Sequence, residues 1–222
     1  MNHFTFSAIL CFVFCLVSGL FFIAKQDRSS RLFGIFWLTV SFWCSFVGFQ
    51  FNLLNVMPHF WWGWLLHFGC IMVPVVFMHF ALVFSGALQR SGMQNFLKLG
   101  YWIAAVFLLL ILFSNWFTAE IAYRDTLNYP RPSFLYPVYI VFFQVMGLVG
   151  TLALFQMRKA LSPEKRKWLY VYLVVHLFAH AGAMDNYLIM YDVRIFPLYP
   201  YGLYMILPYV VLGSIAFRKI RH

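Results

Sequence analysis

Long apolar stretches with almost no charge are the feature that most constrains how this chain folds. A helix needs roughly 20 apolar residues to cross the hydrocarbon core of a bilayer. Seven segments have about this length: residues 4–24, 32–55, 60–86, 99–117, 135–157, 168–190 and 198–217. Backbone amides inside lipid must find partners within their own segment, so each segment is expected to be a helix. We therefore predict an all-α fold with a single domain, residues 1–222, built as a polytopic membrane bundle of seven transmembrane helices.

The composition supports a membrane protein. Of the 222 residues, 64% are hydrophobic and only 10% are charged, whereas soluble domains carry about 25% charged residues. The net charge of +10 is typical of proteins that bind nucleic acid. Here, however, the basic residues fall in short runs between the apolar segments, so membrane lipids are the expected partners and nucleic acid is not.

The basic residues are divided unequally between the two sides of the expected bundle. The first, third and fifth loops and the C-terminal end hold thirteen of them: Lys25, Arg28, Arg31, Arg90, Lys98, Arg158, Lys159, Lys165, Arg166, Lys167, Arg218, Lys219 and Arg221. The opposite side holds only three, Arg124, Arg131 and Arg194. Cytoplasmic loops carry an excess of Lys and Arg, so we expect the N-terminus to lie outside and the C-terminus in the cytoplasm.

Polar side chains from several segments fall at a similar depth, in the outer half of the expected bundle. With a rise of about 1.5 Å per residue, they form a candidate ligand-binding set: Gln50, Asn52, His67, Asp185, Asn186 and, slightly deeper, Gln144. An ionisable group inside a span costs about 3 kcal/mol and usually faces a partner or a wet cavity. His67 is the expected partner of Asp185. The alternative is that Asp185 only links helices through hydrogen bonds and binds no ligand.

The stretch HLFAHAGAMDNY, residues 176–187, places two histidines near the middle of the sixth segment. At roughly 100° per residue, His176 and His180 lie about 40° apart and can face one site, whereas Asp185 lies about 140° from His180 and completes no metal triad. Cys11, Cys15, Cys44 and Cys70 lie within apolar segments, where they are expected to pack as small apolar side chains. We therefore expect no metal and no cofactor. The alternative is haem b or a metal bound by the four histidines His67, His79, His176 and His180.

Several segments of the sequence resemble one protein family. They are RLFGIFWLTVSFWCSFVGFQF (31–51), VPVVFMHFALVFSG (73–86), EKRKWLYVYLVV (164–175) and YDVRIFPLYPYGLYMILPYVVLGSIAFRKIRH (191–222). Together they resemble the seven-helix N-terminal sensor module of bacterial histidine kinases. The residues that match the family pattern are Pro74, His79 and Phe80 in the third segment, Asp185 in the sixth, and Tyr199, Pro200 and Gly202 before the seventh.

The resemblance implies a ligand-sensing module in the bacterial inner membrane whose last helix passes a signal to a cytoplasmic output domain. After AFRKIRH there is no dimerisation helix, phosphoacceptor histidine or ATP-binding domain. The sequence is therefore expected to be either part of a longer kinase or a module that acts on a separate kinase or on other membrane subunits. The family has no single shared ligand, so no binding residue is transferred from it.

Three functions are consistent with the sequence. The first is a sensor or receptor-like module that admits a small amphipathic or lipid-like ligand from the outer face, between the second, third, sixth and seventh helices. The second is a haem b- or quinone-binding subunit, and the third is a structural subunit of a membrane complex. No Ser, Cys or Asp has a convincing catalytic partner by spacing, so no enzymatic activity is expected.

Overall fold

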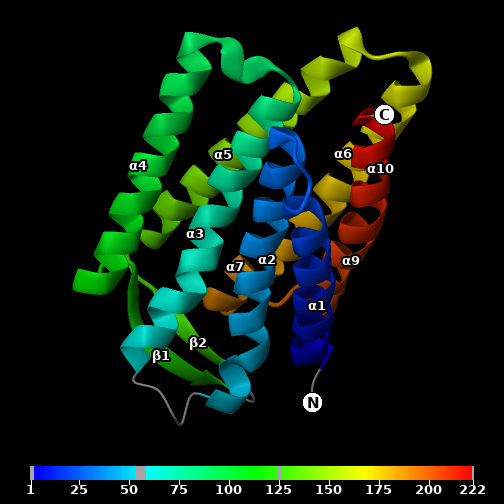
Figure 1. Ribbon diagram of the computed structural model, residues 1–222. Helices are drawn as coiled ribbons and strands as arrows, with labels where there is room; N and C mark the ends of the chain where they lie inside the picture. Colours follow the sequence, from blue (N-terminus) through cyan, green and yellow to red (C-terminus); the bar gives the residue numbers. More distant parts are fainter. Residues whose placement is uncertain (1–2, 54–58, 125–126, 222) are drawn as a thin grey trace.

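The structure is a computed structural model in which helices predominate (Figure 1). It describes the backbone of residues 3–53, 59–124 and 127–221, and the side chains within these ranges except those of residues 4, 48–66 and 118–130. The first part of the chain forms α1 (His3–Ile23), α2 (Arg28–Leu53), α3 (His59–Phe84), the 3₁₀ turn η1 (Ala87–Gln89) and α4 (Ser91–Phe113). The second part forms β1 (Thr118–Arg124), β2 (Leu127–Pro132), α5 (Tyr136–Met157), the 3₁₀ turn η2 (Arg158–Ala160), α6 (Pro163–Ala183) and α7 (Asp185–Met190).

A loop at residues 191–197 follows α7. It leads into one irregular helical segment, called here the last segment (Leu198–Arg221). It consists of short turns that follow one another: α8 (Leu198–Tyr201), the 3₁₀ turn η3 (Gly202–Met205), α9 (Ile206–Pro208), the π-helix η4 (Tyr209–Gly213) and α10 (Ser214–Arg221). A proline in a helix removes a backbone donor and crowds the preceding turn. Pro200 and Pro208 lie in this segment, and π-helical turns are uncommon and often occur at functional sites.

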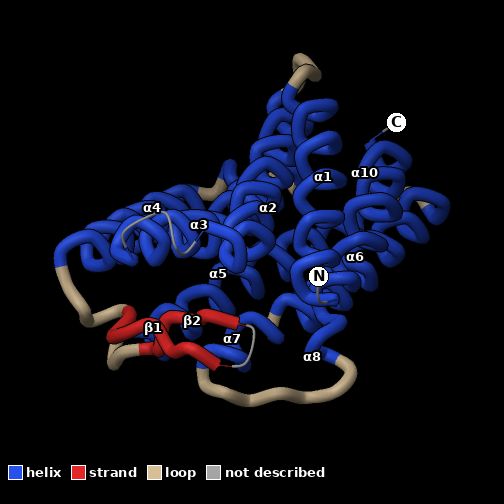
Figure 2. The backbone as a smooth tube through the Cα atoms, turned by 90° about the horizontal axis from the view of Figure 1, so that it is seen from below, coloured by secondary structure: helices blue, strands red, loops and turns tan. Residues whose placement is uncertain are grey.

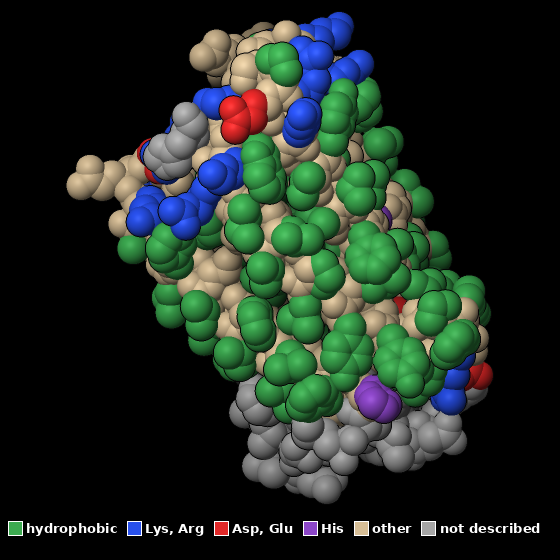
Figure 3. Space-filling model, turned by 90° about the vertical axis from the view of Figure 1, so that its right-hand side faces the viewer, with side chains coloured by type: hydrophobic (Ala, Val, Ile, Leu, Met, Phe, Trp, Pro, Cys, Tyr) green, Lys and Arg blue, Asp and Glu red, His purple; other side chains and the backbone are tan. Residues whose placement is uncertain are grey.

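The long helices run back and forth between two ends of the bundle (Figure 1). The N-terminus, the antiparallel hairpin β1–β2, α7 and α8 lie at one end, which is seen face-on in Figure 2. The α1–α2 turn, η1, η2 and the C-terminus lie at the other end. Lys and Arg side chains gather at this second end, above a surface that is mostly apolar (Figure 3). Most basic residues thus lie at one end of the bundle, as their positions between the apolar segments predict.

Six helical segments in the described part of the chain are long and apolar enough to cross a membrane: Thr5–Ile23, Arg28–Val47, His67–Phe84, Ser91–Phe113, Tyr136–Ala160 and Leu198–Arg221. The predicted sixth span is not among them. Its charged first turn and two histidines lower the hydropathy of α6, which is nevertheless 21 residues long. Large apolar side chains point outward from these helices, such as Trp102 and Phe113 on α4, which are 73% and 82% exposed.

Some predicted boundaries are wrong. The fourth segment begins at Ser91 instead of residue 99 and ends at Phe113 instead of 117, because its polar first turns continue the apolar helix. The predicted sixth span is divided, since α6 ends at Ala183 and α7 begins at Asp185. The long outer loop contains the β1–β2 hairpin, which hydropathy alone does not reveal.

The core is built from aromatic rings and close helix contacts. Phe33 of α2, Phe80 of α3 and Phe217 of α10 meet with ring centroids 4.6 to 5.6 Å apart. In lipid, where apolar burial drives helix association little, such packing and small residues at the interfaces hold helices together. Gly34 is one such residue, because a Cβ there would lie 2.5 Å from the backbone nitrogen of Ile23.

Candidate functional site

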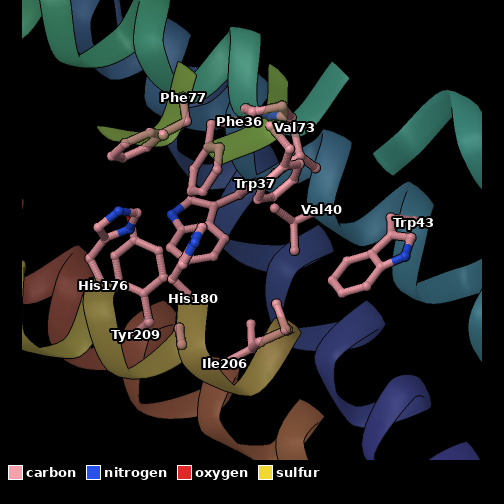
Figure 4. A pocket seen from close by; sticks show the side chains of 15 residues that line it. Phe36, Trp37, Val40, Trp43, Val73, Phe77, His176, His180, Ile206 and Tyr209 are labelled. Atoms are coloured by element: carbon pink, nitrogen blue, oxygen red, sulfur yellow. The ribbon is translucent and has the colours of Figure 1, made fainter. Parts of the chain in front are cut away.

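A narrow cavity lies in the centre of the bundle, where α2, α3, α5, α6 and the last segment meet. Its volume is about 60 Å³, measured as the space that the centre of a water molecule can occupy. Aromatic rings and two imidazoles form most of its wall (Figure 4). The lining residues are Phe36, Trp37, Val40, Trp43, Val73, Pro74, Phe77, Phe143, Gly147, His176, Ala179, His180, Ala183, Ile206 and Tyr209.

His176 lies in the wall between α3 and α5. Its ring stacks on Phe77 with the centroids 4.3 Å apart and the planes 15° from parallel. The hydroxyl of Thr151 donates its proton to the Gly147 carbonyl oxygen at 2.8 Å. Since the hydroxyl has one proton, the 3.2 Å contact between Thr151 Oγ1 and His176 Nε2 requires Nε2–H to donate. Nδ1 is then an acceptor, and this buried atom has no hydrogen-bond partner among the described residues.

His180 lies one turn further along α6 on the same face, with its ring centroid 6.2 Å from that of His176. Both rings line the same cavity. His180 Nε2 is 2.8 Å from Gln144 Oε1, so Nε2–H donates to the amide oxygen. The amide nitrogen of Gln144 donates to Met184 Sδ at 3.0 Å. Both imidazoles are therefore oriented by α5 with Nε2–H directed at a fixed acceptor.

The last segment closes the cavity on the side of the histidines. Tyr209 packs against Trp37 with ring centroids 4.8 Å apart and against His176 at 5.2 Å. Its hydroxyl is 2.6 Å from that of Tyr172 on α6. Figure 4 shows Tyr209 beside the two histidines and facing Phe36 and Trp37. Because Tyr209 begins the π-helix, the irregular turn is part of the cavity wall.

The described members of the polar set that depth alone groups together have different surroundings. The side chains of Gln50 and Asn52 lie outside the described residues. His67 is buried, with its ring edge-to-face against Phe117 and Tyr136. Gln144 is hydrogen-bonded to His180, which is not a member of the predicted ligand-binding set.

Asp185 is fully buried, and neither carboxylate oxygen accepts a hydrogen bond from the described residues. No hydrogen bond therefore joins Asp185 to His67, its predicted partner. The neighbouring Asn186 is 3% exposed, and its Oδ1 is also without a partner in this part of the chain. Buried polar atoms without partners are costly. Asp185 and Asn186 therefore form a second candidate site, more polar than the cavity and closer to the end of the bundle with the hairpin.

Close backbone contact fixes Asp185 against the start of the last segment. A Cβ on Gly202 would lie 2.9 Å from the Asp185 Cβ and 3.3 Å from its Oδ2. A Cβ on Gly202 would also clash with the Gly182 carbonyl oxygen, and one on Gly182 with the Gly202 carbonyl oxygen. Two glycines thus allow α6 and the last segment to touch beside the buried acid.

The four histidines considered as haem or metal ligands do not come together. His67 and His79 are twelve residues apart on α3, or about 18 Å along a helix. His79 Nδ1 is 3.0 Å from the Tyr101 hydroxyl, on the side facing α4. Only His176 and His180 adjoin, and their Nε2 atoms already bind α5 side chains. No group of three or more His, Cys, Asp or Glu among the described residues could hold a metal ion.

The sequence singles out His176 and His180, as residues that can face one site and as possible metal ligands, but it does not single out the aromatic residues of the cavity wall. Gly147 and Thr151 on α5 are four residues apart, as are the histidines they face on α6. A small or hydroxyl-bearing pair on one helix and a histidine pair on the next, both with four-residue spacing, are the pattern that could have indicated this contact from the sequence. Trp37, Phe77 and Tyr209 give no such signal in a chain where 22% of the residues are aromatic.

No protein-family model, no curated protein and no solved structure matches this chain. Its function therefore has to be inferred from the cavity, the buried acid and the last segment.

Proposed function

We propose that this chain is a membrane sensor module in which a small ligand enters the central cavity and displaces the last segment. The observation that carries the proposal is that the cavity shares a wall, Ile206 and Tyr209, with the most irregular helical segment of the bundle. In this proposal the predicted sixth span, α6 followed by α7, completes a bundle of seven. The N-terminus is outside, and the basic end faces the cytoplasm of a cell with an inner membrane.

The cavity lining indicates the chemistry of the ligand. Almost all of the surface is apolar and aromatic, which favours a small apolar or aromatic group. The acceptor Nδ1 of His176 has no partner in the described chain, so a single N–H or O–H donor on the ligand would relieve a buried unsatisfied atom. A phenol or an indole has this combination of ring and donor.

The size of the cavity connects binding to movement. An apolar cavity of about 150 Å³ holds benzene, whereas this one has about 60 Å³. A ring-sized ligand can enter only when a wall moves away. The last segment is the wall with the least regular hydrogen bonding, so a ligand would favour an arrangement of the bundle in which this segment has shifted.

Asp185 is placed to influence the same movement. It is packed against Gly202, where the last segment begins, and its oxygens lack partners among the described residues. A shift of the segment that brings a donor or water to the carboxylate would be favourable. The shift would then reach α10 at the basic end, where a cytoplasmic kinase or another membrane subunit would receive it.

Thermal unfolding of the purified protein with a panel of phenols, indoles and toluene tests the proposal. At 100 times the dissociation constant a ligand stabilises by about 2.7 kcal/mol, so at least one donor-bearing ring should raise the midpoint by several degrees. Gly147→Val, which fills the cavity, should abolish this increase. His176→Phe should weaken phenol or indole binding and leave toluene binding in place.

Gly92→Ala is the matched control, because a Cβ there meets no atom within 4 Å. It should respond to the panel as the unaltered protein does. Equal stabilisation of the Gly147→Val variant, or no response of the unaltered protein to any member of the panel, would refute the cavity as a ligand site.

A further inference from the structure

A second hollow, called here the lateral groove, runs along the outside of the bundle between α1 and the last segment. Its volume is about 430 Å³, measured in the same way as that of the central cavity. Val17 of α1 and Val211 of η4 lie on its walls and are 63% and 44% exposed. The groove is therefore open to the surroundings of the bundle and large enough for a chain-like apolar group.

The lining of the groove is apolar except at two places. Ser18 and Ser214 lie along it, and their hydroxyl oxygens are 3.0 Å apart, so each hydroxyl has a partner in the other. The other polar residue is Arg218, at the basic end. Among the described residues that line the groove, none is acidic. Its chemistry thus changes along its length from apolar to cationic.

Two cations approach the same aromatic ring, that of Phe21, at the basic end of the groove. Lys25, from the turn after α1, lies over the Phe21 ring with Nζ 4.4 Å from the centroid. Arg218 of α10 approaches the same ring, with Cζ at 5.9 Å. Both are exposed, and no ion pair with a carboxylate is formed by either of them in the part of the chain that the structure describes. The nearby Asp27 instead pairs with Arg221, at 2.9 Å.

We propose that the lateral groove binds a phospholipid with a net negative head group. One acyl chain lies between α1 and the last segment, and the phosphate lies between Lys25 and Arg218. Basic residues next to a membrane surface attract anionic lipids. Here two basic residues from different elements lie at one end of the apolar lateral groove, as a phosphate lies at one end of an acyl chain. This charge complementarity favours a lipid over a partner helix, which would not need cations at one end of the groove.

The position of the groove gives the lipid access to the π-helix. Tyr209 lines the central cavity, and Val210 and Val211, the next two residues, line the groove. The lipid and the contents of the cavity would therefore contact opposite sides of the same irregular turn. The lipid site does not depend on a ligand in the cavity, because its lining residues are separate from those of the cavity.

Native mass spectrometry of the delipidated chain of residues 1–222 in detergent tests the proposal. Phosphatidylglycerol and phosphatidylcholine with identical acyl chains are titrated separately. Each basic residue near a membrane contributes about 1 kcal/mol to anionic lipid binding, or roughly fivefold. The Lys25→Gln and Arg218→Gln variants should each weaken phosphatidylglycerol binding about fivefold, and the double variant by about twentyfold or more. Lys219→Gln, an exposed change on the same helix outside the groove, should have no comparable effect.

Val17→Trp, which places a large ring in the groove, should remove the preference for phosphatidylglycerol without unfolding a bundle that it touches only from outside. Equal binding of the two lipids by the unaltered protein would overturn the proposal, as would equal losses in Lys219→Gln and Arg218→Gln. A photo-cross-linking residue at position 211 should capture phospholipid in native membranes. Capture of protein and no lipid at that position would identify a partner helix and also overturn it.

Discussion

Gly147 and Gly150 lie three residues apart on α5 but have different surroundings. A Cβ on Gly147 would meet only His180 Cε1, at the ordinary contact distance of 3.7 Å. A Cβ on Gly150 would lie 2.9 Å from Phe77 Cε1 and 3.2 Å from the Met78 backbone. The first glycine leaves space that belongs to the cavity, and the second allows α3 and α5 to touch.

Gly150→Ala should therefore destabilise the protein by about 1–3 kcal/mol, because an overpacked contact has to be relieved by moving Phe77 or the backbone. Gly147→Ala should be neutral or stabilising by up to about 1 kcal/mol, since alanine is the better helix former. Unfolding of the two purified variants in mixed micelles measures the difference. Equal effects would show that the cavity beside Gly147 is closed.

Asp185→Asn should raise the thermal unfolding midpoint of the protein. The carboxyl is fully buried and has no hydrogen-bond partner among the described residues, and a neutral side chain of the same shape is less costly to bury than a carboxylate. Differential scanning fluorimetry in detergent measures the change. A fall in stability by more than about 1 kcal/mol would mean that the carboxylate makes a stabilising contact that asparagine cannot replace.

The site residues show what depth along a helix predicts and what it does not. Hydropathy and rise per residue placed Asp185 inside the bundle, and its 0% exposure agrees. They do not give the rotation of neighbouring helices, so they paired Asp185 with His67, whose ring instead packs on Phe117. The angular spacing of His176 and His180 on one helix needs no such knowledge, and their rings lie side by side in the cavity wall.

At the scale of elements, an ion pair and a hydrogen bond connect the start of α2 to α10 at the basic end of the bundle. Asp27 precedes α2, and its Oδ1 accepts a hydrogen bond from the Ser30 backbone N–H at 2.9 Å, as an N-cap residue does. Arg221 of α10 pairs with Asp27 Oδ2 at 2.9 Å and donates to Ser30 Oγ at 3.0 Å. Burial alone would raise the pKa of Asp27, but the hydrogen bonds from Ser30 and the charge of Arg221 outweigh this effect and lower the pKa below the ordinary value of an aspartate.

Two substitutions separate the cap from the ion pair. Asp27→Asn keeps the cap and removes the charge, and both side chains of the pair are about one-third exposed. It should therefore cost less than about 1 kcal/mol at neutral pH. Asp27→Ala removes the cap as well and should cost about 1 kcal/mol more.

The pH dependence of the Asp27→Asn difference follows from the lowered pKa. A carboxyl with a lowered pKa stabilises the folded state above its unfolded pKa, and this stabilisation is lost as the pH falls through the folded value. The difference in unfolding free energy between Asp27→Asn and the unaltered protein should thus be constant from neutral pH down to about pH 4 and become smaller below that pH. Unfolding free energies measured across this range test the prediction, and a difference that persists after full protonation would exclude the ion pair as its cause.

The elements also show which local features a sequence reveals. Apolar length predicted the helices near their observed positions, because the requirement for internal hydrogen bonds leaves few other structures in lipid. The break between α6 and α7 and the π-helix at Tyr209–Gly213 were not predicted. These features depend on contacts with distant residues, such as Gly182 with Gly202, that a single segment does not contain.

At the scale of the whole molecule, the placement of basic residues at one end predicts the orientation in the membrane. Asn115 is exposed near the hairpin end and Ser162 is exposed at the basic end, and the four native cysteines are buried. In intact cells a membrane-impermeant maleimide should label Asn115→Cys and leave Ser162→Cys unlabelled until the cells are opened. Labelling in the reverse order would invert the proposed topology.

The central claim is that filling the central cavity moves the last segment. Spin labels at Gln94 on α4 and Lys219 on α10, both exposed, report the distance between the last segment and the opposite side of the bundle. Electron–electron double resonance compares the unaltered protein with Gly147→Phe, whose ring is larger than the cavity, at equal helical content. If filling the cavity moves the last segment, the distance distribution is displaced in Gly147→Phe and unchanged in the Gly92→Ala control. Superimposable distributions in all three proteins would contradict this claim.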